Sequence, residues 1–346
     1  MEFLSVVFQR VFSTIFFKNA VIQGIPLLCG ATGEIITEKS GNLNLGIPGI
    51  MYMGGIGGLV APFLYESYCE SCAIAPNMVV SVTLSVLAAF LLAALGGLIY
   101  SVLTVTFRAN QNVTGLALTT FGVGVGNFLG GSIMKMTGKT GQITVYATGK
   151  AFKACLPFVE SEAVQNNPFL RGVCEMFFSY GFLTYAALFI ALAAYWFLKK
   201  TRAGLNLRAL GESPATADAA SINVNRYKYL STIIGAGIAG LGGLYFVMEY
   251  MGGTWQNDAF GDRGWLAVAL VIFARWNPLN AMWGSILFGG LYILYTRIPI
   301  ANAAQEIFKM LPYIVTIVVL VITSLRKKRE DQPPQHLGLP YFREER

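Results

Sequence analysis

The carboxyl groups of Glu34 and Glu38 directly follow an apolar stretch, residues 25–31. An ionised side chain at membrane depth costs about 2.5 kcal/mol or more, so such residues usually face a cavity or a partner. Two interpretations of Glu34 follow. It either lines a polar path or gate through the membrane, or it accepts a structural hydrogen bond that fixes the turn into residues 40–46.

The stretch Thr137–Thr140, with the sequence TGKT, resembles the end of a phosphate-binding loop. The full pattern requires a glycine five residues before Gly138, and Ile133 stands at that position. The surrounding sequence also lacks the strand and the helix that flank such loops. We treat the match as a coincidence and expect that this chain binds no ATP, so that a partner would have to hydrolyse it.

The chain has 5 cysteines and a single histidine, His336. Cys29 falls in the first apolar span, and the other four fall in stretches that we place outside the membrane. Those four fit either disulfides in an oxidising compartment or free thiols. Because His336 lies in the tail on the opposite side, we expect no metal site. The four outer cysteines are Cys69, Cys72, Cys155 and Cys174.

Composition indicates what must position these residues. Hydrophobic residues make up 55% of the 346 residues and charged residues 12%, whereas soluble domains average about 25% charged. Long apolar runs alternate with short basic stretches, as in a chain that crosses a bilayer repeatedly. The sequence therefore predicts an all-α, polytopic transmembrane helix bundle. The net charge of +7 fits basic loops at the cytoplasmic face, and we expect no nucleic-acid partner.

We predict about nine spans within residues 19–325, preceded by an amphipathic helix over residues 1–18 that lies in the membrane interface. The seventh span is too short to cross about 30 Å of hydrocarbon, which predicts a half-helix or a re-entrant segment buried in protein. The spans are Asn19–Glu38, Gly46–Leu64, Met78–Phe107, Val113–Gly131, Tyr180–Leu198, Leu230–Tyr250, Trp265–Phe273, Leu279–Tyr295 and Lys309–Leu325.

The distribution of Lys and Arg predicts the orientation of the chain. Basic residues are concentrated in the loop Lys199–Lys228 and in the tail over residues 326–346, so we place both in the cytoplasm and the amino terminus outside. The long outer loop, residues 132–179, also contains lysines, which long loops tolerate. The spans hold no paired carboxylates and no histidine cluster by our interpretation, which argues against a membrane-bound enzyme.

Glycine is abundant, at 38 residues, and much of it lies inside the apolar runs. Small residues let helices approach closely in lipid, so the sets at Gly54 and Gly58, at residues 122–130 and at residues 235–243 predict a tightly packed bundle. Aromatic residues that we interpret as lipid-facing or interfacial are Tyr52, Trp196 and Trp283.

The polar segment Thr201–Tyr229 has a composition that predicts two short cytoplasmic helices, over residues 206–210 and 215–221. A glycine and a proline between them force a turn, and Ser213 can cap the second helix. The alanines of the second helix would let another protein surface come close. The segment therefore forms a projecting knob.

This segment resembles the coupling-helix region of permease subunits of ABC importers for ribose, branched-chain amino acids and nucleosides. Two further blocks match that superfamily in the same order, over Gly33–Gly55 and over Gly264–Gly290. The second block, which begins GWLAVALVIFARWNP, is most similar to the nucleoside branch, and the resemblance spans Asn19–Leu325. Relatives often carry Glu where Pro48 stands, so no role of that glutamate is carried over. The outer loop over residues 132–179 has no counterpart that we can match.

The resemblance implies a division of labour between subunits in the bacterial inner membrane. This chain would pair with a second, related permease, with ATPase subunits that bind ATP and Mg²⁺, and with a lipid-anchored solute receptor outside. The expected ATPase contacts in the knob are Gly211, Glu212, Ser213, Pro214, Ala219 and Ala220. The residues expected to line the translocation path are Glu34, Asn42, Asn44 and Asn127.

The expected substrate is a nucleoside, with simple sugars second and branched-chain amino acids third. A nucleoside or a sugar is neutral and needs no ring of charge along its path, which suits spans with few ionisable residues. The other class of function that we keep open is a secondary transporter, which needs no ATPase. Glu34 and the short seventh span would also fit such a carrier, because half-helices and buried charges occur there too.

Overall fold

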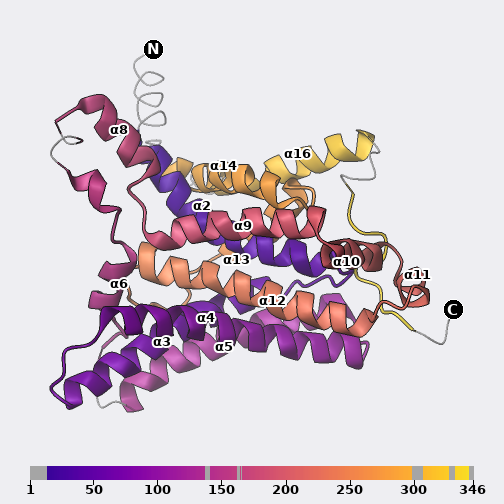
Figure 1. The fold of residues 1–346 in the computed structure, drawn as a ribbon, viewed down its shortest axis with the longest axis horizontal. Coiled ribbons are helices and arrows are strands. Elements are labelled where there is room, and N and C mark those ends of the chain that lie inside the picture. Colours follow the sequence, from indigo (N-terminus) through magenta and orange to yellow (C-terminus); the bar gives the residue numbers. More distant parts are fainter. Residues whose placement is uncertain are drawn as a thin grey trace.

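The computed structural model describes residues 14–136, 141–161, 164, 166–297, 307–326 and 332–342, and these residues form a helix bundle (Figure 1). Short π-helices at Val102–Thr106 and Phe246–Tyr250 extend α4 and α12, and Pro157–Glu160 is a 3₁₀ turn. Within the described residues the only extended pairing is a bridge between Thr144 and Thr254, which confirms the all-α class. The helices are α2 (Thr14–Glu38), α3 (Ile47–Ser71), α4 (Met78–Ser101), α5 (Gln111–Met136), α6 (Tyr146–Phe152), α8 (Pro168–Phe177), α9 (Phe182–Lys200), α10 (Arg202–Glu212), α11 (Pro214–Ala219), α12 (Val224–Tyr245), α13 (Arg263–Phe273), α14 (Pro278–Arg297) and α16 (Leu311–Arg326).

Six helices of the described chain are long and apolar enough to cross a membrane, namely α2, α3, α4, α5, α9 and α12 with their extensions. Shorter apolar helices lie at Arg263–Phe273, Pro278–Leu294 and Leu311–Ile322. Each of the nine predicted spans lies on one of these helices, so the polytopic bundle is confirmed. Several helices run further than predicted, such as α3 to Ser71 and α5 to Met136, because polar loop residues continue the helix beyond its apolar part.

The first helix, α2, begins at Thr14 and continues without a break to Glu38. The interfacial helix that we predict over residues 1–18 lies mostly outside the described residues. Its last part, Thr14–Lys18, is the first turn of α2 rather than part of a separate helix. The apolar side chains of Thr14–Lys18 continue the first span, and no helix-breaking residue lies between Lys18 and Asn19.

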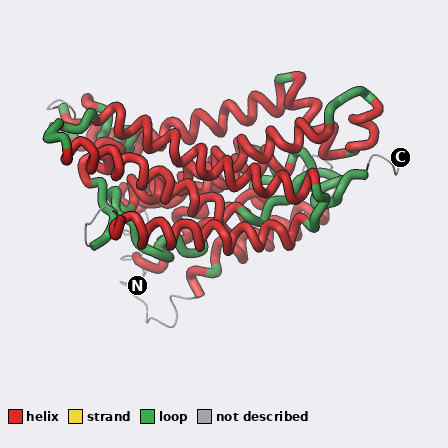
Figure 2. The backbone as a smooth tube through the Cα atoms, turned by 90° about the horizontal axis from the view of Figure 1, so that it is seen from below, coloured by secondary structure: helices red, strands yellow, loops and turns green. Residues whose placement is uncertain are grey.

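The long helices run along one direction, and the loops gather at the two ends of the bundle (Figures 1 and 2). One end carries α6 and α8, and we call it the α6–α8 end. The opposite end carries α10 and α11, which form the projecting knob, together with the last described residues of the chain. The segments predicted to be outer and cytoplasmic thus lie at opposite ends, and we refer to α10 and α11 as the knob.

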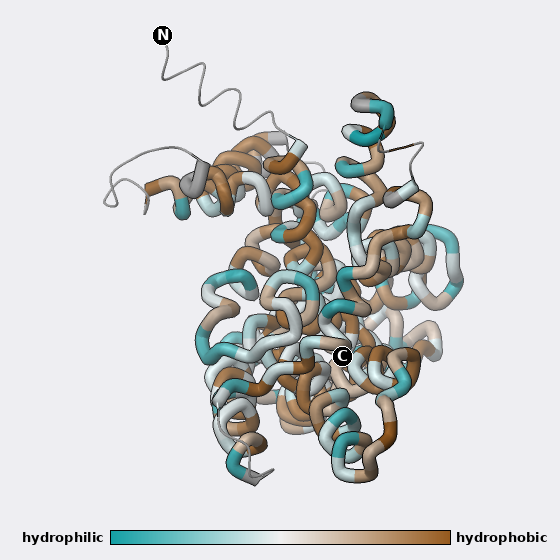
Figure 3. Tube along the Cα trace, turned by 90° about the vertical axis from the view of Figure 1, so that its left-hand side faces the viewer, coloured by the Kyte–Doolittle hydropathy of each residue, from teal (hydrophilic) through white to brown (hydrophobic). Residues whose placement is uncertain are grey.

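The centre of the bundle consists of α2, α3 and α12. In their most apolar windows 94%, 83% and 83% of the residues are buried, whereas the values for α4, α5 and α9 are 28%, 22% and 33%. Seen along the helices, hydrophobic residues extend through the bundle and hydrophilic ones occur in short stretches (Figure 3). Gly54 allows close contact in the centre, because a Cβ there would lie 2.3 Å from the Cα of Gly240.

The seventh predicted span is a half-helix, as its length indicated. The 11 residues of α13 extend about 16 Å, roughly half of the hydrocarbon thickness. The non-helical stretch 251–262 connects α12 to its start. Gly264 at that start packs so closely on α3 that a Cβ would lie 2.4 Å from the Cα of Pro48. Irregular backbone is tolerated at membrane depth where protein surrounds it.

Candidate translocation path and knob

Glu34, Asn42 and Asn44 come together where α2 ends and the chain turns toward α3. The backbone N–H of Asn44 donates to Glu34 Oε1 at 2.9 Å, and the Asn42 amide donates to Thr232 Oγ1 at 3.2 Å. All three side chains are buried, with exposed fractions of 1%, 0% and 0%. We call them the inner cluster. The hydrogen bond to Asn44 is the structural role foreseen for Glu34, and its role in a path stays a prediction.

The inner cluster also keeps unused hydrogen-bonding capacity. Glu34 Oε2, Asn42 Oδ1 and Asn44 Nδ2 are buried without a hydrogen-bond partner among the described residues. A buried polar atom without a partner costs about 1–3 kcal/mol, so such atoms need an explanation by water, strain or function. Their grouping at one place fits a polar passage that is closed in this conformation.

Glu38 lies one helical turn after Glu34 and is likewise buried. Its Oε2 accepts a hydrogen bond from the indole N–H of Trp276, which follows α13. The Glu38 side chain also interacts with that of Glu34, so our expectation that the spans hold no paired carboxylates is wrong. The four-residue spacing was visible in the sequence, since residues i and i+4 share a helix face. The partner Trp276 was not, because it is 238 residues away.

Asn127 lies apart from the inner cluster, on α5. Its Oδ1 accepts a hydrogen bond from Tyr52 OH at 2.5 Å, and Tyr52 OH in turn accepts from Asp258 N at 2.9 Å. The structure thus brings together three of the four predicted path residues and leaves Asn127 at a second place. Tyr52 is 4% exposed, so its interpretation as lipid-facing is wrong. Trp196 and Trp283, at 61% and 77%, are exposed as expected.

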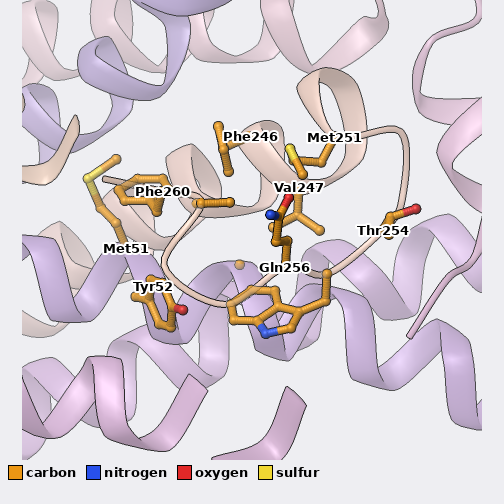
Figure 4. A pocket seen from close by; sticks show the side chains of 12 residues that line it. Met51, Tyr52, Phe246, Val247, Met251, Thr254, Gln256 and Phe260 are labelled. Carbon is orange, nitrogen blue, oxygen red and sulfur yellow. The ribbon is translucent and has the colours of Figure 1, made fainter. Parts of the chain in front are cut away.

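A pocket lies beside Tyr52, between α3, the end of α12 and the stretch 251–262 (Figure 4). In Figure 4 the rings of Tyr52 and Phe260 lie on one side and Thr254 on the other, with the Gln256 side chain between them. The ring of Trp255 meets Tyr52 edge to face, with centroids 5.0 Å apart. We call this the aromatic pocket. Its volume is only about 10 Å³, which is room for no more than one water molecule, so the aromatic pocket is closed to a solute in this conformation.

Arg263, the first residue of α13, supports one wall of the aromatic pocket. Its guanidinium lies 4.5 Å from the ring centroid of Phe246, and its Nε and Nη2 donate to Gln23 Oε1 at 3.2 and 3.1 Å. The side chain is buried, with 6% exposed. Sequence reasoning missed this residue, although a lone Arg at the start of a short apolar span was a usable signal.

The knob has the architecture that the sequence predicted. Two helices meet at a bend, and Ser213 Oγ accepts a hydrogen bond from Thr216 N at 3.3 Å as the cap of α11. The predicted contact residues differ in exposure. Gly211 and Pro214 are buried, Ser213 is half-buried, and the exposed ones are Glu212, Ala219 and Ala220. The exposed residues are the ones that another protein could touch directly.

The four outer cysteines are free thiols in the structure, and so is Cys29. Cys69 and Cys174 are buried, Cys155 is half-buried and Cys72 is exposed. The sequence left open either disulfides or free thiols. The structure contains free thiols, and disulfide formation stays a prediction. No group of three or more His, Cys, Asp or Glu side chains that could hold a metal occurs among the described residues.

Comparison with known proteins identifies the family of this chain. A family model described as "Branched-chain amino acid transport system / permease component" matches residues 16–320. The chain belongs to this family. The permease is 30% identical over 330 residues to a putative glucose ABC transporter permease of Haloferax volcanii, with 89% of this chain and 91% of the relative covered.

Three further relatives of the permease are named for nucleosides. A nucleoside ABC transporter permease of Lactococcus lactis is 29% identical over 312 residues, covering 88% of this chain and 90% of the relative. A guanosine ABC transporter permease of Bacillus subtilis is 28% identical over 333 residues, covering 94% and 96%. A second nucleoside permease of Lactococcus lactis matches over 92 residues at 28% identity. No solved structure matches the permease.

Proposed function

We propose that this permease is the membrane subunit of an ATP-driven importer of nucleosides. The observation that carries the substrate class is its similarity, over 88% and 94% of the chain, to permeases named for nucleosides and for guanosine. The aromatic pocket, with a volume of only about 10 Å³ in this conformation, would have to open before a base could stack on its rings, a contact worth about 1–3 kcal/mol per base. The glucose permease relative supports simple sugars as the second candidate.

The proposed path runs from the aromatic pocket to the inner cluster, and α13 lies between the two. Gly264, at its start, packs on Pro48 four residues before Tyr52. Trp276, just beyond its end, donates a hydrogen bond to Glu38, one helical turn after Glu34 of the inner cluster. A shift of this half-helix would change both places together. Alternating access requires an element with two positions whose balance is changed by binding at two sites, and α13 would be that element between the aromatic pocket and the inner cluster.

The proposed partners follow from the division of labour in ABC systems. ATPase subunits that bind ATP and Mg²⁺ would dock on the exposed residues of the knob, in the cytoplasm, together with the carboxyl terminus. A second permease would complete the channel, and the pair of Lactococcus lactis relatives supports this. A lipid-anchored solute receptor would deliver the nucleoside at the α6–α8 end, outside the bacterial inner membrane.

Uptake by cells with and without the gene tests the substrate. We expect loss of labelled nucleoside uptake in the deletion strain and normal uptake of ribose and leucine. Loss of sugar uptake with normal nucleoside uptake would make the second candidate the function. Normal uptake of all three would remove the substrate proposal.

A further inference from the structure

The carboxyl-terminal segment Gln332–Phe342 lies against the knob (Figure 1). We call it the strap. The backbone N–H of His336 donates to the carbonyl of Gly211 at 3.0 Å, and Tyr341 OH donates to Asp218 Oδ2 at 3.0 Å. The strap therefore contacts both helices of the knob, at the end of α10 and in α11.

The strap also contacts the elements that carry the inner cluster. The backbone N–H of Gly338 donates to the carbonyl of Gly41 at 3.2 Å, directly before Asn42 in the chain. The amide of Gln111, the first residue of α5, donates to the carbonyl of Leu339 at 3.4 Å. The strap thus connects the knob to the turn on which the inner cluster is built.

A groove of about 480 Å³ lies between the strap and the knob. The wall on the knob begins at Glu212 and ends at Ala215, and the wall on the strap begins at Gln335 and ends at Phe342. Leu339 is 52% exposed in this groove. The groove is therefore lined by polar and apolar side chains in similar measure, and its polar members include Glu212, Gln335 and His336.

The knob alone is a small surface for a stable complex. The 6 residues of α11 extend about 9 Å, and its exposed side chains are mostly alanines. A specific protein interface buries about 800 Å² per partner, contributed by roughly 20–30 residues. A protein that docks on α11 must therefore cover neighbouring surface too, and the groove is continuous with the exposed residues of the knob.

Resting on the proposed function, we propose that the strap forms a second wall of the ATPase docking site. An amphipathic segment of the ATPase subunit enters the groove, and its apolar side chains contact Leu339 and Tyr341 on the strap. Because the strap is also bonded to Gly41, movement of the ATPase reaches the inner cluster through the strap as well as through α10.

The test is a titration of the purified full-length permease with labelled ATPase subunits in detergent. Leu339→Glu places a charge in the groove and should raise the Kd about tenfold or more, because the carboxylate would be buried without a partner. Leu156→Glu is the matched control, since Leu156 is 39% exposed and lies between α6 and α8, at the end of the bundle opposite the knob. It should leave the Kd within about twofold of the wild type. A wild-type Kd for Leu339→Glu would overturn the proposal.

Two further variants separate docking from folding and from the proposed function. Tyr341→Phe and Asp218→Ala each remove the hydrogen bond between the two side chains, so each should raise the Kd about threefold, and the double variant should be no worse than the weaker-binding single one. Additive effects would contradict the pairing. Ala219→Arg on the knob should abolish binding. If it binds normally, or if the wild type binds no ATPase, the proposed function itself fails; if only Leu339→Glu binds normally, the strap proposal alone fails.

Discussion

At the scale of single residues, Tyr52 links the aromatic pocket to Asn127. Its hydroxyl donates to Asn127 and accepts from the backbone of Asp258, while its ring packs against Trp255. We expect Tyr52→Phe to raise the KM for nucleoside uptake about tenfold, because each lost hydrogen bond is worth about 1 kcal/mol. Labelled uptake kinetics measure this. The control is Tyr146→Phe, whose side chain is 75% exposed and should leave KM unchanged. Equal effects of the two changes would contradict a role of Tyr52 in the site.

His336 makes the contact of the strap depend on pH. Burial lowers the pKa of His336 below its ordinary value of about 6.5, and the positive charge of Lys228 lowers it further. Glu212 is the acidic residue that lines the same groove. The docked strap therefore binds a proton less readily than the free strap. The contact of the strap with the knob is therefore strongest above the ordinary pKa of histidine and weakens as the pH falls through that value.

The probe is a cysteine introduced by Leu339→Cys, in a chain whose own cysteines are replaced by serine. We expect its rate of reaction with a thiol reagent, divided by the fraction of thiolate, to be higher at about pH 5.5 than at about pH 7.5. The same cysteine combined with His336→Gln should lose this excess. An unchanged pH profile in the His336→Gln chain would show that another group is responsible.

At the scale of helices, close packing of glycine faces holds the bundle together. A Cβ at Gly122 would lie 2.4 Å from the carbonyl oxygen of Gly49, whereas a Cβ at Gly124 meets nothing within 4 Å. Gly122→Ala should therefore destabilise the permease by about 1–3 kcal/mol. Gly124→Ala, two residues along the same helix, should be neutral or stabilise it by up to about 1 kcal/mol. Thermal unfolding in detergent compares them, and equal melting temperatures would contradict the packing described here.

The sequence predicted the helices better than it predicted their contacts. Hydrophobic length located each span, and the shortness of the seventh predicted the half-helix α13. The bend and cap of the knob followed from Gly211, Ser213 and Pro214, because these residue types act locally. The bond between Glu38 and Trp276, the burial of Tyr52 and the return of the strap were not predicted. Each depends on residues far apart in the chain, for which periodicity and composition give no signal.

At the scale of the whole molecule, the two ends of the bundle should lie on opposite sides of the membrane. Cys72, exposed at the end of α3, should react with an impermeant thiol reagent on intact cells. A cysteine introduced by Ser213→Cys in the knob should react only after the cells are permeabilised. The reverse pattern would place the knob outside, where no ATPase could reach it.

We propose that this permease couples ATP hydrolysis by partner subunits to nucleoside uptake through the knob. The most direct measurement is labelled nucleoside uptake into proteoliposomes that contain the full complex and its solute receptor, with ATP and Mg²⁺ on the side of the knob. We predict uptake that requires ATP there and that Ala219→Arg abolishes together with nucleoside-stimulated hydrolysis. Uptake by the permease alone, driven by an ion gradient without ATP, would contradict the account.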